Sequence, residues 1–137
     1  MTPSVPEIIR GCTIALATPA PPESAGDFAA GRVGLVSMLL GLSAQEANRC
    51  VGATIAENAD IRALFAASGD AAVAEAARET DTDLTIAGLD AANAALRRQL
   101  IALHERVEAA GNHDLDRQIT ALYVRMARGR RLELGRG

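Results

Sequence analysis

The chain has 137 residues, of which 49% are hydrophobic but only 2% aromatic, and all 14 basic residues are arginine. This composition excludes intrinsic disorder, collagen-like repeats and disulfide scaffolds, and the length suits one compact domain. A net charge of −3 and the scarcity of aromatic rings for base stacking argue against a nucleic-acid partner.

All five prolines lie within residues 1–22. We expect residues 1–23 to form an arm, with one short ordered piece around Glu7–Leu16 followed by a Pro-rich linker. The segment lacks a basic region before a long apolar run, so no secretion signal and a cytoplasmic location are expected. The longest apolar run, Val33–Leu42, is well short of the roughly 20 residues that cross a bilayer, so no membrane span is expected.

The spacing of apolar residues over 24–68 predicts one long helix that stops at Ser68-Gly69. The alternative is a break at Gly41. The apolar run inside it has large side chains on every side of a helical wheel. A helix of this kind must be buried on every side, and in so small a chain we expect a second subunit to cover one of them. The side chains expected to need this cover are Leu35, Leu39 and Leu42.

A stripe of small residues follows the same helix at alternating spacings of four and three. It consists of Ala30, Gly34, Ser37, Gly41, Ala44 and Asn48. A glycine inside a helix costs about 1 kcal/mol relative to alanine, so two of them on one stripe need a reason. Missing side chains let another helix approach closely, and we expect a tight crossing between subunits at Gly34, Ser37 and Gly41. Space for a ligand's acyl chain, or a broken helix with loop glycines, are the alternatives.

We expect a short helix or helical linker over residues 70–80. The clearest helix is predicted over residues 84–110, with Thr82 or Asp83 as its N-terminal cap. Its heptad positions are Ile86, Leu89, Asn93, Leu96, Leu100, Leu103, Val107 and Ala110. A final helix is predicted to start at Asn112 or Asp114. The predicted fold is an all-α antiparallel bundle of three to four helices in one domain over residues 24–128, followed by a basic tail over 129–137.

Two asparagines lie on the apolar faces of these predicted helices. Asn58 precedes Ser68 by ten residues and Asn93 follows Asp83 by ten, so an antiparallel hairpin would bring both to one level. We expect a polar core pair, because an unpaired buried amide costs about 1–3 kcal/mol. A lone asparagine in a heptad can also fix register and partner number, so docking of a partner helix is the alternative.

Candidates for metal or redox chemistry are few. His104 and Glu108 stand four residues apart on one helix face, which fits a weak metal or acid–base pair, but the chain lacks the Glu-x-x-His spacing of di-iron bundles. Cys12 and Cys50 are too few and too far apart for a disulfide framework or a zinc site. We therefore expect a structural histidine, with no metal and no cofactor.

Positive charge gathers near the C-terminus. Residues 1–110 carry 8 arginines and 14 acids, a net of −6, whereas residues 111–137 carry 6 arginines and 3 acids, a net of +3. These arginines are candidates to contact an anion, a partner or the acidic stretch Asp70–Asp90 of a second copy. Favourable charge at a helix C-terminus is the simpler interpretation. The candidate residues are Arg125, Arg128, Arg130 and Arg131.

These features predict a non-enzymatic, self-associating protein, most simply a homodimer, that binds an unknown protein partner as an adaptor or chaperone-like interaction module. The first alternative is a small-molecule carrier or sensor with an apolar pocket between helices, opened by Gly34 and Gly41. The less favoured alternative is an enzyme, which would need Glu57, Arg62 and His104 to converge from two helices.

Overall fold

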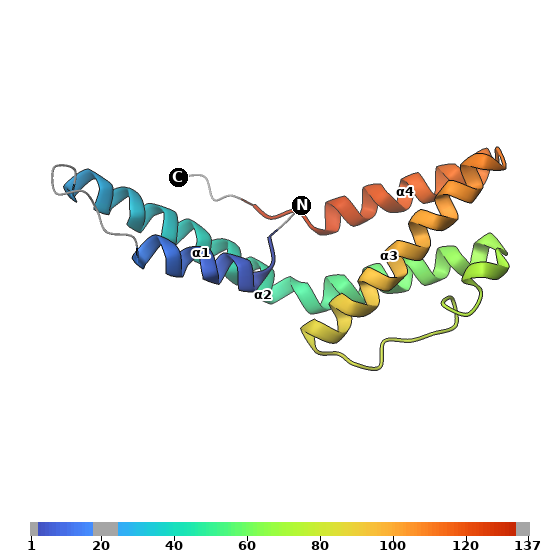
Figure 1. Ribbon diagram of the computed structural model, residues 1–137, viewed down its shortest axis with the longest axis horizontal. Helices are drawn as coiled ribbons and strands as arrows, with labels where there is room; N and C mark the ends of the chain where they lie inside the picture. The colour runs from blue at the N-terminus through green and yellow to red at the C-terminus, as the bar shows by residue number, and fades with distance from the viewer. Residues whose placement is uncertain (1–2, 18–24, 134–137) are drawn as a thin grey trace. The chain divides into compact units, whose positions relative to one another are not determined.

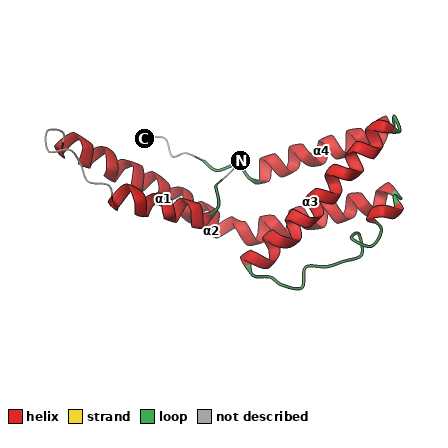
Figure 2. Cartoon of the chain, viewed as in Figure 1, coloured by secondary structure: helices red, strands yellow, loops and turns green. Residues whose placement is uncertain are grey.

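The computed structural model describes residues 3–17 and 25–133. Within these residues it contains four α-helices, one short 3-10 helix and no strand (Figure 1; Figure 2). The helices are α1 (Val5–Ala17), α2 (Ala25–Ser68), η2 (Ala71–Val73), α3 (Ile86–Ala109) and α4 (His113–Gly129). The prediction of an all-α protein is thus confirmed for the described residues, and no helix among them is both long and apolar enough to span a membrane.

The helix count differs from the prediction at the N-terminus. Residues 5–17 form a regular helix of 13 residues, where the proline pattern predicted an arm with a short ordered piece. Ser4 and Glu7 explain its start, because the Ser4 backbone N–H and hydroxyl both donate to Glu7 Oε2, at 2.7 and 2.8 Å. The predicted Pro-rich linker lies almost entirely outside the described residues.

The chain packs as two units, and each is described by itself. The first comprises Met1–Arg49 with Arg131–Gly137, and the second comprises Cys50–Arg130. Helix α2 contributes residues to both units and is a single helix, without the break considered at Gly41. The single domain predicted over residues 24–128 and the separate tail over 129–137 stay predictions.

In the first unit, α1 and the N-terminal part of α2 form an antiparallel hairpin (Figure 1). Arg32 Nε donates to the Ala15 carbonyl over 2.6 Å, and its Nη2 donates to the Leu16 carbonyl. These bonds satisfy carbonyl groups that the last turn of α1 leaves without helical partners. Nearer the other end, a Cβ built at Gly11 would lie 3.7 Å from Leu39 Cδ1, an ordinary packing distance.

The second unit has an apolar core formed by the C-terminal part of α2, by η2, and by α3 and α4. Its buried residues are Ile61, Leu64, Phe65, Val73, Ala76, Leu96, Leu100, Leu103, Val107, Leu115, Ile119, Leu122 and Met126. Helix α3 buries its predicted heptad from Leu89 to Val107, whereas Ile86, in the first turn, is half exposed. The 3.6-residue periodicity therefore identified the inner face of this helix correctly.

The helix ends of the second unit follow local signals. Gly69 and Gly111 both have positive φ angles, 66° and 64°, and follow the ends of α2 and α3. Asn112 caps α4, one of its two predicted positions. The predicted cap of α3 at Thr82 or Asp83 is wrong: Thr85 Oγ1 accepts from the Gly88 N–H at 3.1 Å, while Asp83 accepts from the Thr85 N–H in the turn before the helix.

Candidate functional site

A chain of hydrogen bonds between six polar side chains crosses the second unit. Its members are Glu57, Asn58 and Arg62 on α2, Asp81 in the loop before α3, Asn93 on α3, and Arg130 directly after α4. We call this set the polar network. Because its members come from two helices, the loop before α3 and the residue that follows α4, it fixes how these segments meet.

The centre of the polar network is the pair of asparagines. Asn93 Nδ2 donates to Asn58 Oδ1 over 2.9 Å, and both residues are buried. Asn58 Nδ2 donates in turn to both carboxylate oxygens of Asp81, each at 3.1 Å. Both amides thus exchange their lost water contacts for protein partners, which burial of an amide requires.

On one side, the polar network ends in a two-point ion pair between Arg130 and Glu57. Arg130 donates from Nε to Glu57 Oε2 over 2.9 Å and from Nη2 to Oε1 over 2.7 Å, and Asn93 also donates to Oε1, at 2.8 Å. Burial opposes the charge on Glu57, whose side chain is 8% exposed, but the hydrogen bonds from Arg130 and Asn93 outweigh it and lower the pKa of the carboxyl. Glu57 is therefore a fixed anion at neutral pH.

On the other side, Arg62 Nη2 donates to Asp81 Oδ1 over 2.8 Å. This hydrogen bond, together with that from Asn58, lowers the pKa of the Asp81 carboxyl against the opposing effect of burial. Asp81 holds the loop onto α2, since it is the loop's member of the polar network. This role was not predicted, because Asp81 lies among other acidic and polar residues of a segment without periodicity.

The residues of the enzyme hypothesis have separate partners in the structure. Glu57 is paired with Arg130, Arg62 with Asp81, and His104 with Asp116. A carboxylate whose pKa is lowered by ion pairing is a weak general base at neutral pH, so Glu57 lacks the tuning that proton transfer needs. The hydrogen bonds of the polar network connect α2 with the loop before α3, with α3 and with the residue after α4.

The four arginines near the C-terminus have different surroundings. Arg130 belongs to the polar network, and Arg125 Nε lies 3.3 Å from Asp60 Oδ2 on α2. Arg128 is exposed on α4, and Arg131, which belongs to the first unit, is exposed as well. Arg130 was a candidate to contact an anion or a partner, and its pairing with a buried glutamate of the same chain was not predicted.

The interface candidates of the first unit divide into two groups. Leu39 and Leu42 are partly covered, and Leu39 packs near Gly11 of α1, where a second subunit was expected. The physical reason is that residues 5–17 form a helix able to cover this side. Leu35 is 44% exposed. The remaining candidates Gly34, Ser37 and Gly41 are exposed, and a Cβ built at either glycine meets no described atom within 4 Å.

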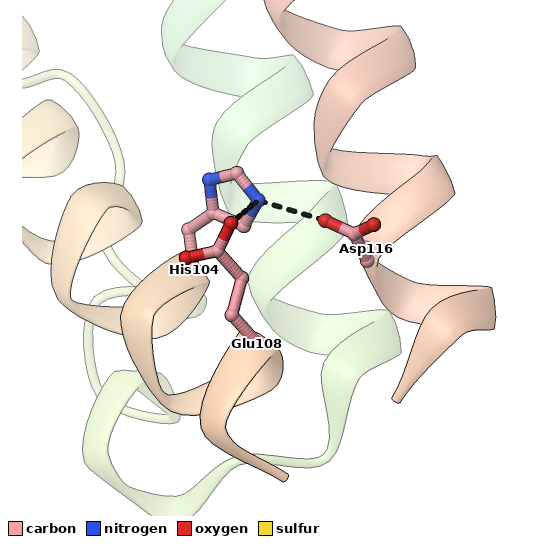
Figure 3. Close-up of side chains that lie close together, drawn as sticks. All are labelled: His104, Glu108 and Asp116. Atoms are coloured by element: carbon pink, nitrogen blue, oxygen red, sulfur yellow. Dashed lines mark hydrogen bonds and ion pairs between the residues drawn. The ribbon is translucent and has the colours of Figure 1, made fainter. Parts of the chain in front are cut away.

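His104 lies where α3 and α4 meet (Figure 3). Its Nε2 lies at hydrogen-bond distance, 2.8 Å, from Asp116 Oδ1 and 3.7 Å from Glu108 Oε1. The spacing of His104 and Glu108 was visible in the sequence, whereas Asp116 was missed because the turn at Gly111 and Asn112 brings it back from the next helix.

A hollow of about 420 Å³ in the second unit is open to solvent and lined by Glu75, Arg78 and Glu79. Its lining is charged, unlike the apolar pocket of the carrier hypothesis.

Comparisons with protein-family models, with curated proteins and with solved structures found no match in any of the three.

Proposed function

We propose that the protein is a non-enzymatic helical-bundle protein that forms a homodimer through the exposed face of α2 in the first unit. This face carries the small residues Gly34, Ser37 and Gly41 along its centre, and we call it the glycine face. In this proposal, the antiparallel bundle of the second unit is the rigid part of each protomer, and the dimer is the form that binds a protein partner as an adaptor.

The observation that carries the proposal is the exposure of large apolar side chains beside the glycine face. Val33 is 65% exposed, Leu40 55% and Met38 46%. No charged residue occurs between Arg32 and Glu46, so no charged side chain in this stretch favours exposure of the face to water. A contiguous apolar surface of this kind marks an interaction site in a soluble protein, because its burial is favourable by about 25 cal/mol per Å².

A second copy of the same face is the best-supported occupant. On a helical wheel the glycine face lies roughly opposite Arg32 and Leu39, the residues that contact α1, so the hairpin leaves it open. The alternating spacing of four and three matches the seam between two helices that wrap around each other. Small side chains allow the helix axes to approach to the lower end of the usual 8–10 Å, with Val33 and Met38 closing the flanks.

The experiment is sedimentation velocity across a wide range of protein concentrations with the double variant Gly34→Leu/Gly41→Leu. Because a Cβ at either position meets open space and leucine favours helices over glycine, the protomer is expected to stay folded by circular dichroism. The wild-type protein is expected to sediment as a dimer and the double variant as a monomer.

Gly52→Leu is the matched control. Gly52 is exposed on the same helix and its built Cβ also meets no described atom within 4 Å, but it belongs to the second unit and lies outside the glycine face. This variant is expected to remain a dimer. A wild-type protein that stays monomeric at all concentrations, or a dimer that survives the double substitution, would contradict the proposal.

A further inference from the structure

Three potential metal ligands from two helices converge near the turn between α3 and α4. They are His104 and Glu108 on α3 and Asp116 on α4, and one ligand atom of each lies within 4.8 Å of the others (Figure 3). Both carboxylates face the same imidazole nitrogen, Nε2. That nitrogen can carry only one proton and lies 2.8 Å from Asp116 Oδ1, whereas Glu108 Oε1 at 3.7 Å is left outside hydrogen-bond distance.

The charges at this place are unbalanced in comparison with five other carboxylates of the second unit. Glu57, Asp60, Asp70, Asp81 and Asp114 each form an ion pair with an arginine. Glu108 and Asp116, by contrast, share a single imidazole in the described contacts.

Their positions on the helices sharpen the contrast. Asp116 lies in the first turn of α4, where the helix dipole stabilises a negative charge. Glu108 lies in the last turn of α3, where the dipole opposes one. A cation bound between Glu108 and Asp116 would offset the repulsion between their two negative charges.

The three side chains are held on a rigid support. The residues beside His104 and Asp116 in the sequence, Leu103 and Leu115, are buried in the core, so both helices are fixed at this level. The His104 ring also packs against the Tyr123 ring, with centroids 5.5 Å apart and an interplanar angle of 55°. Ligands positioned on packed helices need little rearrangement when an ion binds, which is a requirement of an effective metal site.

We propose that His104, Glu108 and Asp116 bind one divalent transition-metal ion of the zinc class. One imidazole nitrogen and two carboxylate oxygens are a donor set that zinc accepts, with bond lengths of about 2.0–2.2 Å. His104 Nε2 lies 2.8 Å from Asp116 Oδ1 and 3.7 Å from Glu108 Oε1. Small side-chain rotations therefore bring these three donor atoms to the spacing that such an ion requires. The partly exposed carboxylates leave room for water as the fourth ligand.

In this role the ion connects the last turn of α3 to the first turn of α4. It stabilises the hairpin by binding the folded chain and not the unfolded one, and the effect grows with free metal concentration. The inference is independent of the homodimer proposed above, because all three ligands belong to one protomer and to the second unit.

The test is isothermal titration of the metal-free, full-length protein with Zn²⁺. One ion per chain is expected for the wild-type protein, together with a Zn²⁺-dependent rise in Tm. Asp116→Asn and His104→Gln are expected to weaken binding at least tenfold and to abolish the rise in Tm. Glu108→Gln, at a side chain that is 65% exposed and therefore safe for folding, is expected to weaken binding as well.

Asp114→Asn is the matched control for Asp116→Asn. Both aspartates lie in the first turn of α4 and both substitutions remove one negative charge, but Asp114 pairs with Arg117. Binding is expected to change less than twofold in this variant. Two results would overturn the proposal: no binding by the wild-type protein, in which case a histidine–carboxylate pair is all that exists here, or binding that persists in His104→Gln and Glu108→Gln, which assigns the ion to other residues.

Discussion

Asn93 donates a hydrogen bond of 2.9 Å to Asn58 Oδ1, and this single contact joins the two halves of the polar network. Asn58 also donates to Asp81, which accepts a second hydrogen bond from Arg62. Asn93 also donates to Glu57 and accepts from Arg130. Loss of either amide therefore removes hydrogen bonds from a buried carboxylate as well as from the other amide.

Asn58→Leu is expected to lower the free energy of unfolding by about 3 kcal/mol, because it leaves Asn93 and Asp81 each short of a buried partner. Asn93→Leu is expected to cost a similar amount. The double variant is expected to lose at least about 1 kcal/mol less than the sum of the two single losses, since the amides share one bond. Urea denaturation of the four proteins measures this coupling, and strictly additive losses would contradict it.

Arg130→Met removes the cation from Glu57 and leaves a buried carboxylate without its ion pair. Because the Arg130 side chain is 39% exposed, the expected loss is about 2 kcal/mol, below the 3–5 kcal/mol typical of fully buried pairs. Arg128→Met, at an exposed position two residues earlier, is expected to change stability by less than about 0.5 kcal/mol. Equal effects of the two substitutions on the urea midpoint would refute the importance of the ion pair.

The stability of the protein is expected to decrease in acid. Glu57 and Asp81 have pKa values lowered by folding from their ordinary values of 4.5 and 3.8. A carboxyl with a lowered pKa stabilises the fold at all pH values above its unfolded pKa, and this contribution disappears as the pH falls through the folded pKa. The free energy of unfolding should therefore decrease below about pH 4.5. Measured by urea denaturation at a series of pH values, the decrease should be smaller in Glu57→Gln; an unchanged slope would exclude Glu57 as a contributor.

Two glycines of the second unit are expected to respond oppositely to alanine. Gly111 has a φ of 64°, which strains any residue with a Cβ, so Gly111→Ala should destabilise the protein by about 1 kcal/mol. Gly52 lies within α2 with no described atom near a built Cβ, so Gly52→Ala should stabilise it by up to about 1 kcal/mol. Thermal denaturation compares the two, and a stabilised Gly111→Ala would argue against the left-handed turn.

The apolar periodicity of the sequence was sufficient to predict α2, α3 and α4 and the inner faces of α3 and α4. Leucines and isoleucines three and four positions apart share one face of a helix, and that face must be buried to remove them from water. Leu96, Leu100 and Ile119 could therefore be assigned to the core. The two asparagines could be paired because they interrupt such faces at matching distances from a turn. The helix Val5–Ala17 was underestimated because prolines dominate its surroundings.

The partners of buried charges could not be predicted in the same way. Periodicity indicates which face of a helix is buried, but it carries no information on which distant residue reaches a given carboxylate. Asp81 is in a loop, and Arg130 is one of several arginines near its end of the chain, so neither differed from its neighbours in sequence. Asp116 likewise became a neighbour of His104 only through the geometry of the turn between α3 and α4.

The ion pair between Glu57 and Arg130 spans 73 positions of the chain. A ribosome that synthesises the chain from its N-terminus produces the anion first and its cation only after α2, α3 and α4 are complete. During that interval the nascent hairpins can bury apolar side chains, but they must leave the Glu57 carboxylate in contact with water. The Glu57 carboxylate gains its ion pair only after Arg130 has been synthesised, so the polar network is completed after α2, α3 and α4 have all been made.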